Sequence, residues 1–237
     1  MFSGEITVLL ATAASLGFIH TLIGPDHYLP FIVMSRAGKW SLMKTMVVTL
    51  FSGIGHILSS VVLGFVGVAL GIAVGKLEAV ESFRGDLAGW ALITFGLVYG
   101  VWGLRRALHK RKAPHSHIFG GHHHVHTHED GLTPHPHEDA EPTPSMTPWV
   151  LFTVFVLGPC EPLIPLLMYP AAKHNIMGVV MVASVFGAVT IATMMSIVLA
   201  TSLGMHQLKL GWMERYTHAL AGGAICMCGV AIQFLGL

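Results

Sequence analysis

The chain has 237 residues, of which 53% are hydrophobic and only 11% are charged, and its mean hydropathy is +0.68. This composition leaves too little polar surface to cover a water-soluble globule, and it predicts an integral membrane protein. The formal net charge of +1 excludes a strongly basic surface, so we expect the lipid bilayer and no nucleic acid as a partner.

Six apolar windows are long enough to cross roughly 30 Å of hydrocarbon. We therefore expect an all-α membrane protein with six transmembrane helices, in the windows 5–24, 45–74, 87–104, 149–170, 176–204 and 215–236. All five tryptophans fall near the ends of these windows, where the amphipathic indole prefers the membrane interface. No Lys or Arg precedes the first window, which favours a retained span over a cleaved signal peptide.

The first window contains ionisable residues together with a Gly-Pro pair, namely His20, Gly24, Pro25, Asp26 and His27. Ionisable groups at membrane depth are expensive unless they face a partner, a cavity or an ion, so they indicate a functional site. In one continuous helix His20 and His27 would stand about 10.5 Å apart along the axis, at ~1.5 Å per residue. We expect Gly24 and Pro25 to break the helix and bring Asp26 and His27 towards His20.

The second window contributes His56, in the sequence Gly53-Ile54-Gly55-His56, where the glycines permit close helix approach. His56 is the expected fourth ligand. Imidazoles mixed with a carboxylate suit Ni²⁺, Co²⁺, Zn²⁺ or Cu²⁺ as the bound ion. Two alternatives stay open: a structural polar network that locks a broken helix, and, for His56 alone, a satisfied interior histidine.

Residues 109–147 interrupt the apolar pattern with nine histidines between positions 115 and 137, interleaved with Pro, Asp and Glu. Such a segment is expected to be disordered without metal. Neutral imidazoles bind transition-metal ions, so the segment is interpreted as a metal buffer or sensor. A purification tag and a solvated linker between two halves are the alternatives.

The fourth window contains a second Gly-Pro pair, in the sequence Gly158-Pro159-Cys160-Glu161-Pro162, which lies 134 residues after the first. Further residues match at the same offset of 134 through two windows, which indicates an internal repeat. Glu161 is expected to act as a ligand or a proton carrier. Cys160 is either a ligand or a small buried apolar residue. The prediction is a three-helix repeat at 1–108, a loop at 109–147 and a second three-helix repeat at 148–237. Since three crossings are an odd number, the second repeat is inverted.

Inverted repeats with broken helices are typical of transporters with a substrate site near the bilayer midplane. Ten of the 13 Lys and Arg residues fall on loops that share one side, and this side is expected to be cytoplasmic. Both termini would then face outward from a plasma (inner) membrane, with the His-rich loop inside. A cytoplasmic reservoir of histidines favours export, while uptake stays open, and protons are expected to compete with metal at acid pH.

Residues 17–27, Gly-Phe-Ile-His-Thr-Leu-Ile-Gly-Pro-Asp-His, resemble the His and Asp-His signature of nickel/cobalt transporters, and most closely the NicO and urease-accessory UreH-like branch. Five residues separate His20 from Asp26, whereas the better-known permease signature has four. The resemblance implies six spans in inverted halves, a histidine-rich central loop and movement of Ni²⁺ or Co²⁺. The residues that it carries over are His20, Asp26, His27 and His56.

Three other functions are weighed against metal transport. A thiol-disulfide electron carrier of the cytochrome c biogenesis type needs two thiols from equivalent positions, yet Asp26 stands where Cys160 would need its partner. An intramembrane zinc hydrolase is disfavoured because the His-Glu-x-x-His spacing is absent, so no enzyme is expected. A metal sensor that binds without transport stays open, as does a homo-oligomer.

Overall fold

The computed structural model describes residues 2–109, 147–206 and 211–235, and within these ranges it is helical without strands. The helices are α1 (Phe2–Ile23), α2 (Leu29–Ala37), α3 (Leu42–Ala69), α4 (Val74–His109), α5 (Thr147–Leu157), α6 (Leu163–Ala172), α7 (Ile176–His206) and α8 (Thr217–Leu235). Short 3-10 helices cover Pro25–His27 and Gly211–Tyr216. The nine clustered histidines of the expected metal-binding loop lie outside the described residues.

Among the described residues, five helices are long and apolar enough to cross a membrane, which agrees with the predicted all-α membrane protein. They are Gly4–Ile23, Leu42–Ala69, Val74–His109, Ile176–Gly204 and Glu214–Leu235. The expected span at 149–170 is instead two short helices, α5 with 11 residues and α6 with 10, on either side of residues 158–162. Pro159 and Pro162 account for the interruption, because proline lacks the backbone N–H that a continuous helix needs.

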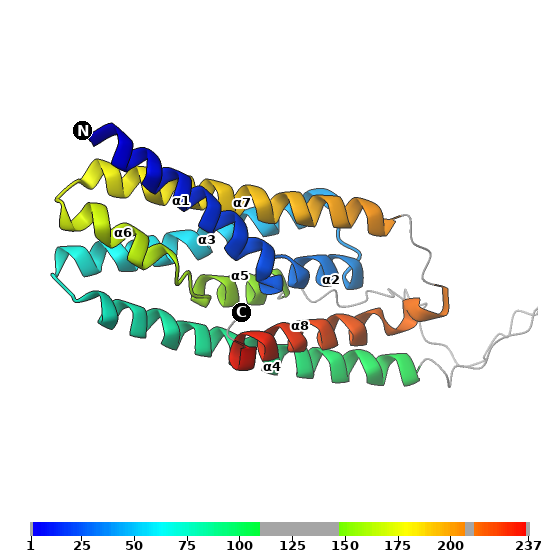
Figure 1. The fold of residues 1–237 in the computed structure, drawn as a ribbon. Helices are drawn as coiled ribbons and strands as arrows, with labels where there is room; N and C mark the ends of the chain where they lie inside the picture. Colours follow the sequence, from blue (N-terminus) through cyan, green and yellow to red (C-terminus); the bar gives the residue numbers. More distant parts are fainter. Residues whose placement is uncertain (1, 110–146, 207–210, 236–237) are drawn as a thin grey trace, which may run out of the picture.

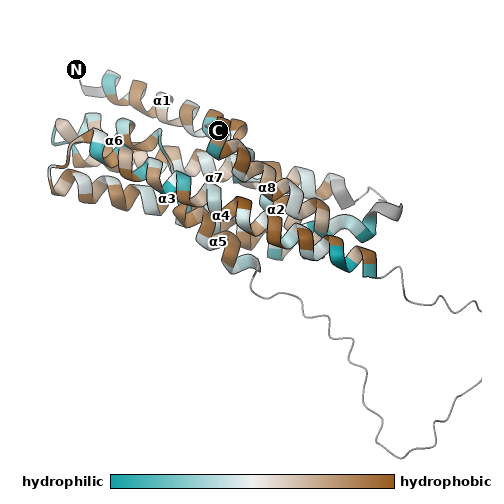
Figure 2. Cartoon of the chain, turned by 90° about the horizontal axis from the view of Figure 1, so that it is seen from below, coloured by the Kyte–Doolittle hydropathy of each residue, from teal (hydrophilic) through white to brown (hydrophobic). Residues whose placement is uncertain are grey.

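Hydrophobic residues occur along the length of the helices, with hydrophilic residues interspersed (Figure 2). Large side chains such as Phe51, Phe83 and Val98 are more than half exposed, at 61%, 66% and 66%. Water-soluble monomers seldom expose contiguous apolar surface on this scale. The outward-facing residues of these helices therefore fit contact with lipid.

The helices form an elongated bundle whose connections gather at its two ends (Figure 1). One end carries the α2–α3 connection, the C-terminal end of α4 and the 3-10 helix Gly211–Tyr216. The other end carries the start of α1 and the α3–α4 and α6–α7 connections. Both Gly-Pro breaks, between α1 and α2 and between α5 and α6, lie within the length of the bundle and not at its ends.

Glycines allow α4 and α8 to pack closely against each other. A Cβ on Gly96 would overlap the backbone of Cys226, and one on Gly222 would overlap Gly100. Small residues at such an interface allow helix backbones to approach within van der Waals contact. The two helices therefore pack backbone to backbone along this seam.

Candidate metal centre

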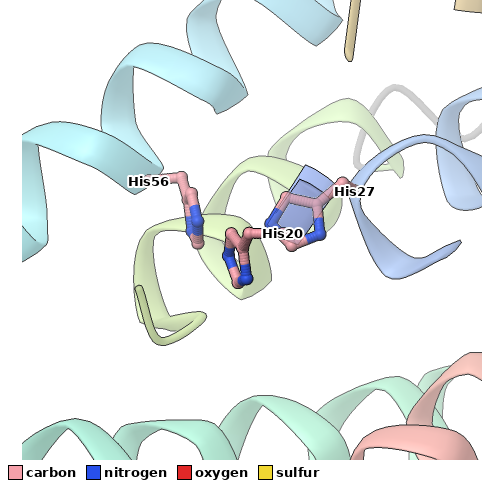
Figure 3. A group of neighbouring side chains, drawn as sticks. All are labelled: His20, His27 and His56. Carbon is pink, nitrogen blue, oxygen red and sulfur yellow. The ribbon is translucent and has the colours of Figure 1, made fainter. Parts of the chain in front are cut away.

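Three histidines from separate segments meet inside the bundle (Figure 3). His20 lies in the last turn of α1, His27 in the 3-10 helix that follows, and His56 in the middle of α3. The ring centroids of His20 and His27 are 4.7 Å apart, and those of His27 and His56 are 5.2 Å apart. One ring nitrogen from each histidine lies within 4.8 Å of the others, a spacing that could hold a single metal ion.

The break after α1 makes this meeting geometrically feasible. Gly24 leaves the helical conformation at φ −80° and ψ 95°, and Pro25 then opens the 3-10 helix. A Cβ on Gly24 would lie 2.7 Å from Nδ1 of His27 and 2.8 Å from Oδ1 of Asp26, so a larger residue would push these side chains away. The His27 amide donates to the carbonyl of Gly24 over 3.1 Å, which closes the turn.

Backbone carbonyls fix which nitrogen of two rings carries the proton. Nδ1 of His27 lies 3.2 Å from the carbonyl oxygen of Gly24, and Nδ1 of His56 lies 3.2 Å from that of Phe155. A carbonyl can only accept a hydrogen bond, so each Nδ1 is the donor and each Nε2 of the neutral ring has a free lone pair. Metal-binding histidines are commonly oriented in this manner by a carbonyl or carboxylate on the other nitrogen.

Within the part of the chain that the structure describes, the Nε2 atoms of all three histidines are buried and have no hydrogen-bond partner. The residues His27 and His56 are each only 3% exposed. Leaving a buried polar nitrogen unpaired costs about 1–3 kcal/mol, so three such atoms in one place need an explanation. Three imidazole nitrogens are a suitable donor set for a borderline transition-metal ion, with coordination positions left for water or another ligand.

The other predicted site residues take different places around this cluster. Oδ1 of Asp26 lies 3.2 Å from Nδ1 of His27, so the carboxylate contacts the same ring nitrogen as the carbonyl of Gly24 and leaves Nε2 free. Glu161 lines a cavity of about 420 Å³ together with His20, Asp26 and His27. Cys160 is completely buried among apolar side chains, and it does not belong to the nitrogen cluster.

Sequence analysis missed a buried ion pair that holds the second break. Nη1 of Arg84 lies 2.6 Å from Oε1 of Glu81, whose side chain is completely buried. Nη2 of Arg84 donates to Oγ of Ser59 over 2.6 Å and to the carbonyl of Val156 over 2.7 Å. The second carboxylate oxygen of Glu81 accepts from the amide of Cys160 over 3.1 Å. The pair thereby joins α4 to α3, to the end of α5 and to the break that follows it.

The ion pair is not apparent from the sequence because the third apolar window begins only at residue 87, which leaves Arg84 in the preceding loop. In the structure α4 begins at Val74 and includes Arg84. The available signal was the spacing of opposite charges three residues apart, which places Glu81 and Arg84 on one helix face.

The arrangement places three imidazole nitrogens within 4.8 Å of one another, beside a cavity with carboxylates in its wall. Nitrogen ligands at this spacing could bind a cation reversibly. The chain matches no known protein-family model, no curated protein and no solved structure.

Proposed function

We propose that this chain is a membrane transporter of divalent transition-metal ions, with Ni²⁺ and Co²⁺ as the preferred substrates, and that His20, His27 and His56 bind the ion during transfer. Two observations carry the proposal together: one ring nitrogen from each of the three histidines lies within 4.8 Å of the others, and the Nε2 atoms of these histidines are buried without a partner among the described residues. Nitrogen ligands select Ni²⁺, Co²⁺, Zn²⁺ or Cu²⁺ over alkali and alkaline-earth ions. The resemblance of residues 17–27 to nickel/cobalt transporters narrows this set to the first two.

The cavity beside the cluster supports an access route for cations. Besides His20 and His27, its wall contains the carboxylates of Asp26, Asp86 and Glu161. Acidic groups that line a cavity with low-dielectric walls raise the local concentration of cations. In this proposal Glu161 receives the hydrated ion before the histidines bind it, and Asp26 keeps His27 in the metal-binding tautomer.

We further propose that 1–108 and 148–237 are inverted copies of one three-helix unit. The pairing of helices supports this relation, because α1 packs against α7 while α5, its counterpart, packs against α3, the counterpart of α7. The counterparts α4 and α8 pack against each other, as do α3 and α7. Two such halves can rock about a shared site, which gives alternating access.

For orientation we propose that the end of the bundle with the α2–α3 connection and the C-terminal end of α4 faces the cytoplasm, since its loops carry most of the Lys and Arg residues. The start of α1 then faces outward. Export is the proposed direction, with the His-rich segment as the cytoplasmic reservoir.

An electron carrier is less well supported. Thiol-disulfide exchange needs a second thiol that reaches the first, and Cys160, Cys226 and Cys228 are all free. A metal sensor would share the histidine cluster, so measurement of metal flux separates it from a transporter.

The decisive experiment measures flux of Ni²⁺, Co²⁺, Zn²⁺ and Cu²⁺ across proteoliposomes, with metal binding measured on the same preparation. His27→Ala is expected to abolish flux and to weaken binding by more than about 100-fold, because loss of a direct ligand exceeds the effect of losing an outer partner. His109→Ala is the matched control, since His109 is exposed at the end of α4 and lies outside the cluster. Flux should also fall at acid pH as protons compete for Nε2.

Unchanged flux in His27→Ala would show that the histidine cluster is not the transport site. Tight binding by the native chain with no flux of any of the four ions would identify a metal sensor instead. Preferred flux of Zn²⁺ or Cu²⁺ would keep the site and correct the substrate.

A further inference from the structure

A row of buried hydroxyl side chains extends along α3 from the histidine cluster. Thr45, Thr49 and Ser52, called here the hydroxyl row, precede His56 at spacings of four, three and four residues, so all four side chains share one helix face. The three hydroxyl residues are at most 1% exposed. Polar atoms therefore line this face of α3 over about 16 Å, at ~1.5 Å per residue.

Two of the three hydroxyls in this row lack a hydrogen-bond partner among the described residues, while that of Thr45 donates to the carbonyl of Ser41 over 3.1 Å. A helical Ser or Thr can donate to the carbonyl four residues earlier, as Thr12 and Ser196 do. The buried hydroxyls of Thr49 and Ser52 make no hydrogen bond, and neither does that of Ser202 on α7. A buried hydroxyl without a partner is destabilising, so three on neighbouring helices indicate that these atoms have a partner in another state of the molecule.

The row connects two features of the fold. Its inner end meets His56, and its outer end, at Thr45, reaches a second cavity of about 290 Å³. This cavity lies at the end of the bundle with the α2–α3 connection, and its wall includes Ser202, Arg36 and Lys39. The cavity with Asp86 and Glu161 adjoins the histidines, so the hydroxyl row lies between the cluster and a different opening.

Apolar side chains close this route in the present structure. Phe31, Met34, Met194 and Val198 belong to one buried cluster, and each is at most 1% exposed. Met194 lies against α3 at Gly53, where its Sδ would be 3.4 Å from an added Cβ. The row itself is at most 1% exposed, so the route is closed to solvent in the present structure.

We propose that the hydroxyl row, with Ser202, is the closed half of the permeation path, and that its oxygens bind the water shell of a hydrated divalent transition-metal ion when α3 and α7 separate. This inference rests on the proposed transport function and adds the second half of its route. Hydroxyl oxygens accept hydrogen bonds from metal-bound water without the strong binding that would retain the ion. Small residues also favour close helix packing, and packing alone predicts that hydroxyl loss at constant size has no effect on flux.

The test removes hydroxyls at nearly constant size in the full chain. Thr49→Val and Ser52→Ala are made singly and together, and Ser196→Ala is the matched control because its hydroxyl bonds its own helix. Equilibrium Ni²⁺ and Co²⁺ binding is measured in detergent, and flux is measured in proteoliposomes. For the double variant we expect binding within about twofold of native and flux lower by about tenfold or more, the size of one or two lost hydrogen bonds. Ser196→Ala should keep native flux.

Native flux in the double variant would overturn the proposal and leave the row as a packing surface. Absence of Ni²⁺, Co²⁺, Zn²⁺ and Cu²⁺ flux in the unmodified chain would instead defeat the proposed function, so the two failures are distinguishable. If the double variant loses metal binding through misfolding, Thr49→Val and Thr49→Ser decide the matter, because only the second keeps the oxygen. Equal flux in these two would also overturn the proposal.

Discussion

The two Gly-Pro breaks share a sequence pattern and differ in how their polar groups are satisfied. At the first, residues 24–28, the buried Nε2 of His27 has no partner. At the second, residues 158–162, an amide donates to Glu81, and Arg84 donates to carbonyls on the α5 side of the break. A broken helix frees the same kinds of backbone group in both places.

The difference indicates which of two similar breaks is built to bind a ligand. The backbone amide of His27 at the first break is paired within the chain as well, so the contrast lies in the buried side chains. Buried side chains that pair with the break, as Glu81 and Arg84 do at the second, favour a structural joint, whereas a buried side-chain nitrogen without a partner, as at the first, favours a ligand site. The comparison therefore predicts that variants at the second break affect stability first, whereas variants at the first break affect metal binding first.

The largest expected effect is at the second break. Arg84→Met leaves the carboxylate of Glu81 buried without its cation, and removal of one partner of a buried pair costs about 3–5 kcal/mol of unfolding free energy. Denaturant unfolding in detergent measures this loss. Arg105→Met is the control, because Arg105 is exposed near the end of the same helix. The double variant Arg84→Met, Glu81→Gln should recover part of the lost unfolding free energy. Native stability in Arg84→Met would contradict the claim that the ion pair stabilises the second break.

A smaller effect is expected from Asp26→Asn at the first break. The amide can donate to Nδ1 of His27 and so favour the tautomer whose Nε2 carries the proton. Metal affinity should fall by about 10–100-fold, as for other outer partners of metal-binding histidines, with unfolding free energy close to native. Metal titration monitored by calorimetry gives the affinity. Glu161→Gln is the comparison variant, with affinity within about twofold of native because Glu161 lies outside the nitrogen cluster. A greater loss in Glu161→Gln than in Asp26→Asn would make Glu161 a direct ligand.

The smallest effect is expected from Cys160→Ala. The thiol is buried in an apolar cluster, and alanine keeps a small apolar side chain there, so metal flux should stay within about twofold of native. Proteoliposome flux is the measurement, with Cys228→Ala as a second buried thiol for reference. Complete loss of activity in Cys160→Ala alone would revive the thiol carrier.

Sequence reasoning reached the histidines because charged or polar groups in an apolar window are conspicuous. His20, His27 and His56 were expected together, and the structure brings them together. The place of Asp26 could not be derived from spacing, since it depends on the direction of the chain through the 3-10 helix. The same holds for Cys160 and Glu161, which are adjacent in sequence but face an apolar cluster and a cavity, respectively.

Two other features escaped the sequence for different reasons. Glu81 and Arg84 fell before the apolar window, and only the observed length of α4 shows that they are inside the bundle. The hydroxyl row was invisible because Ser and Thr hardly change local hydropathy, and many such residues satisfy themselves within their own helix. Whether they do so is a property of packing and not of composition.

The seam between α4 and α8 limits how the molecule can change shape. With backbone against backbone at Gly96 and Gly222, the contact leaves no room for a side chain between the two helices. The seam lies between the last helices of the two proposed halves, so rocking of one half against the other would pivot here. Motion that uncovers His56 is then expected in the helices on the other side of the histidine cluster, and a residue larger than glycine at position 96 would force the two backbones apart at this pivot.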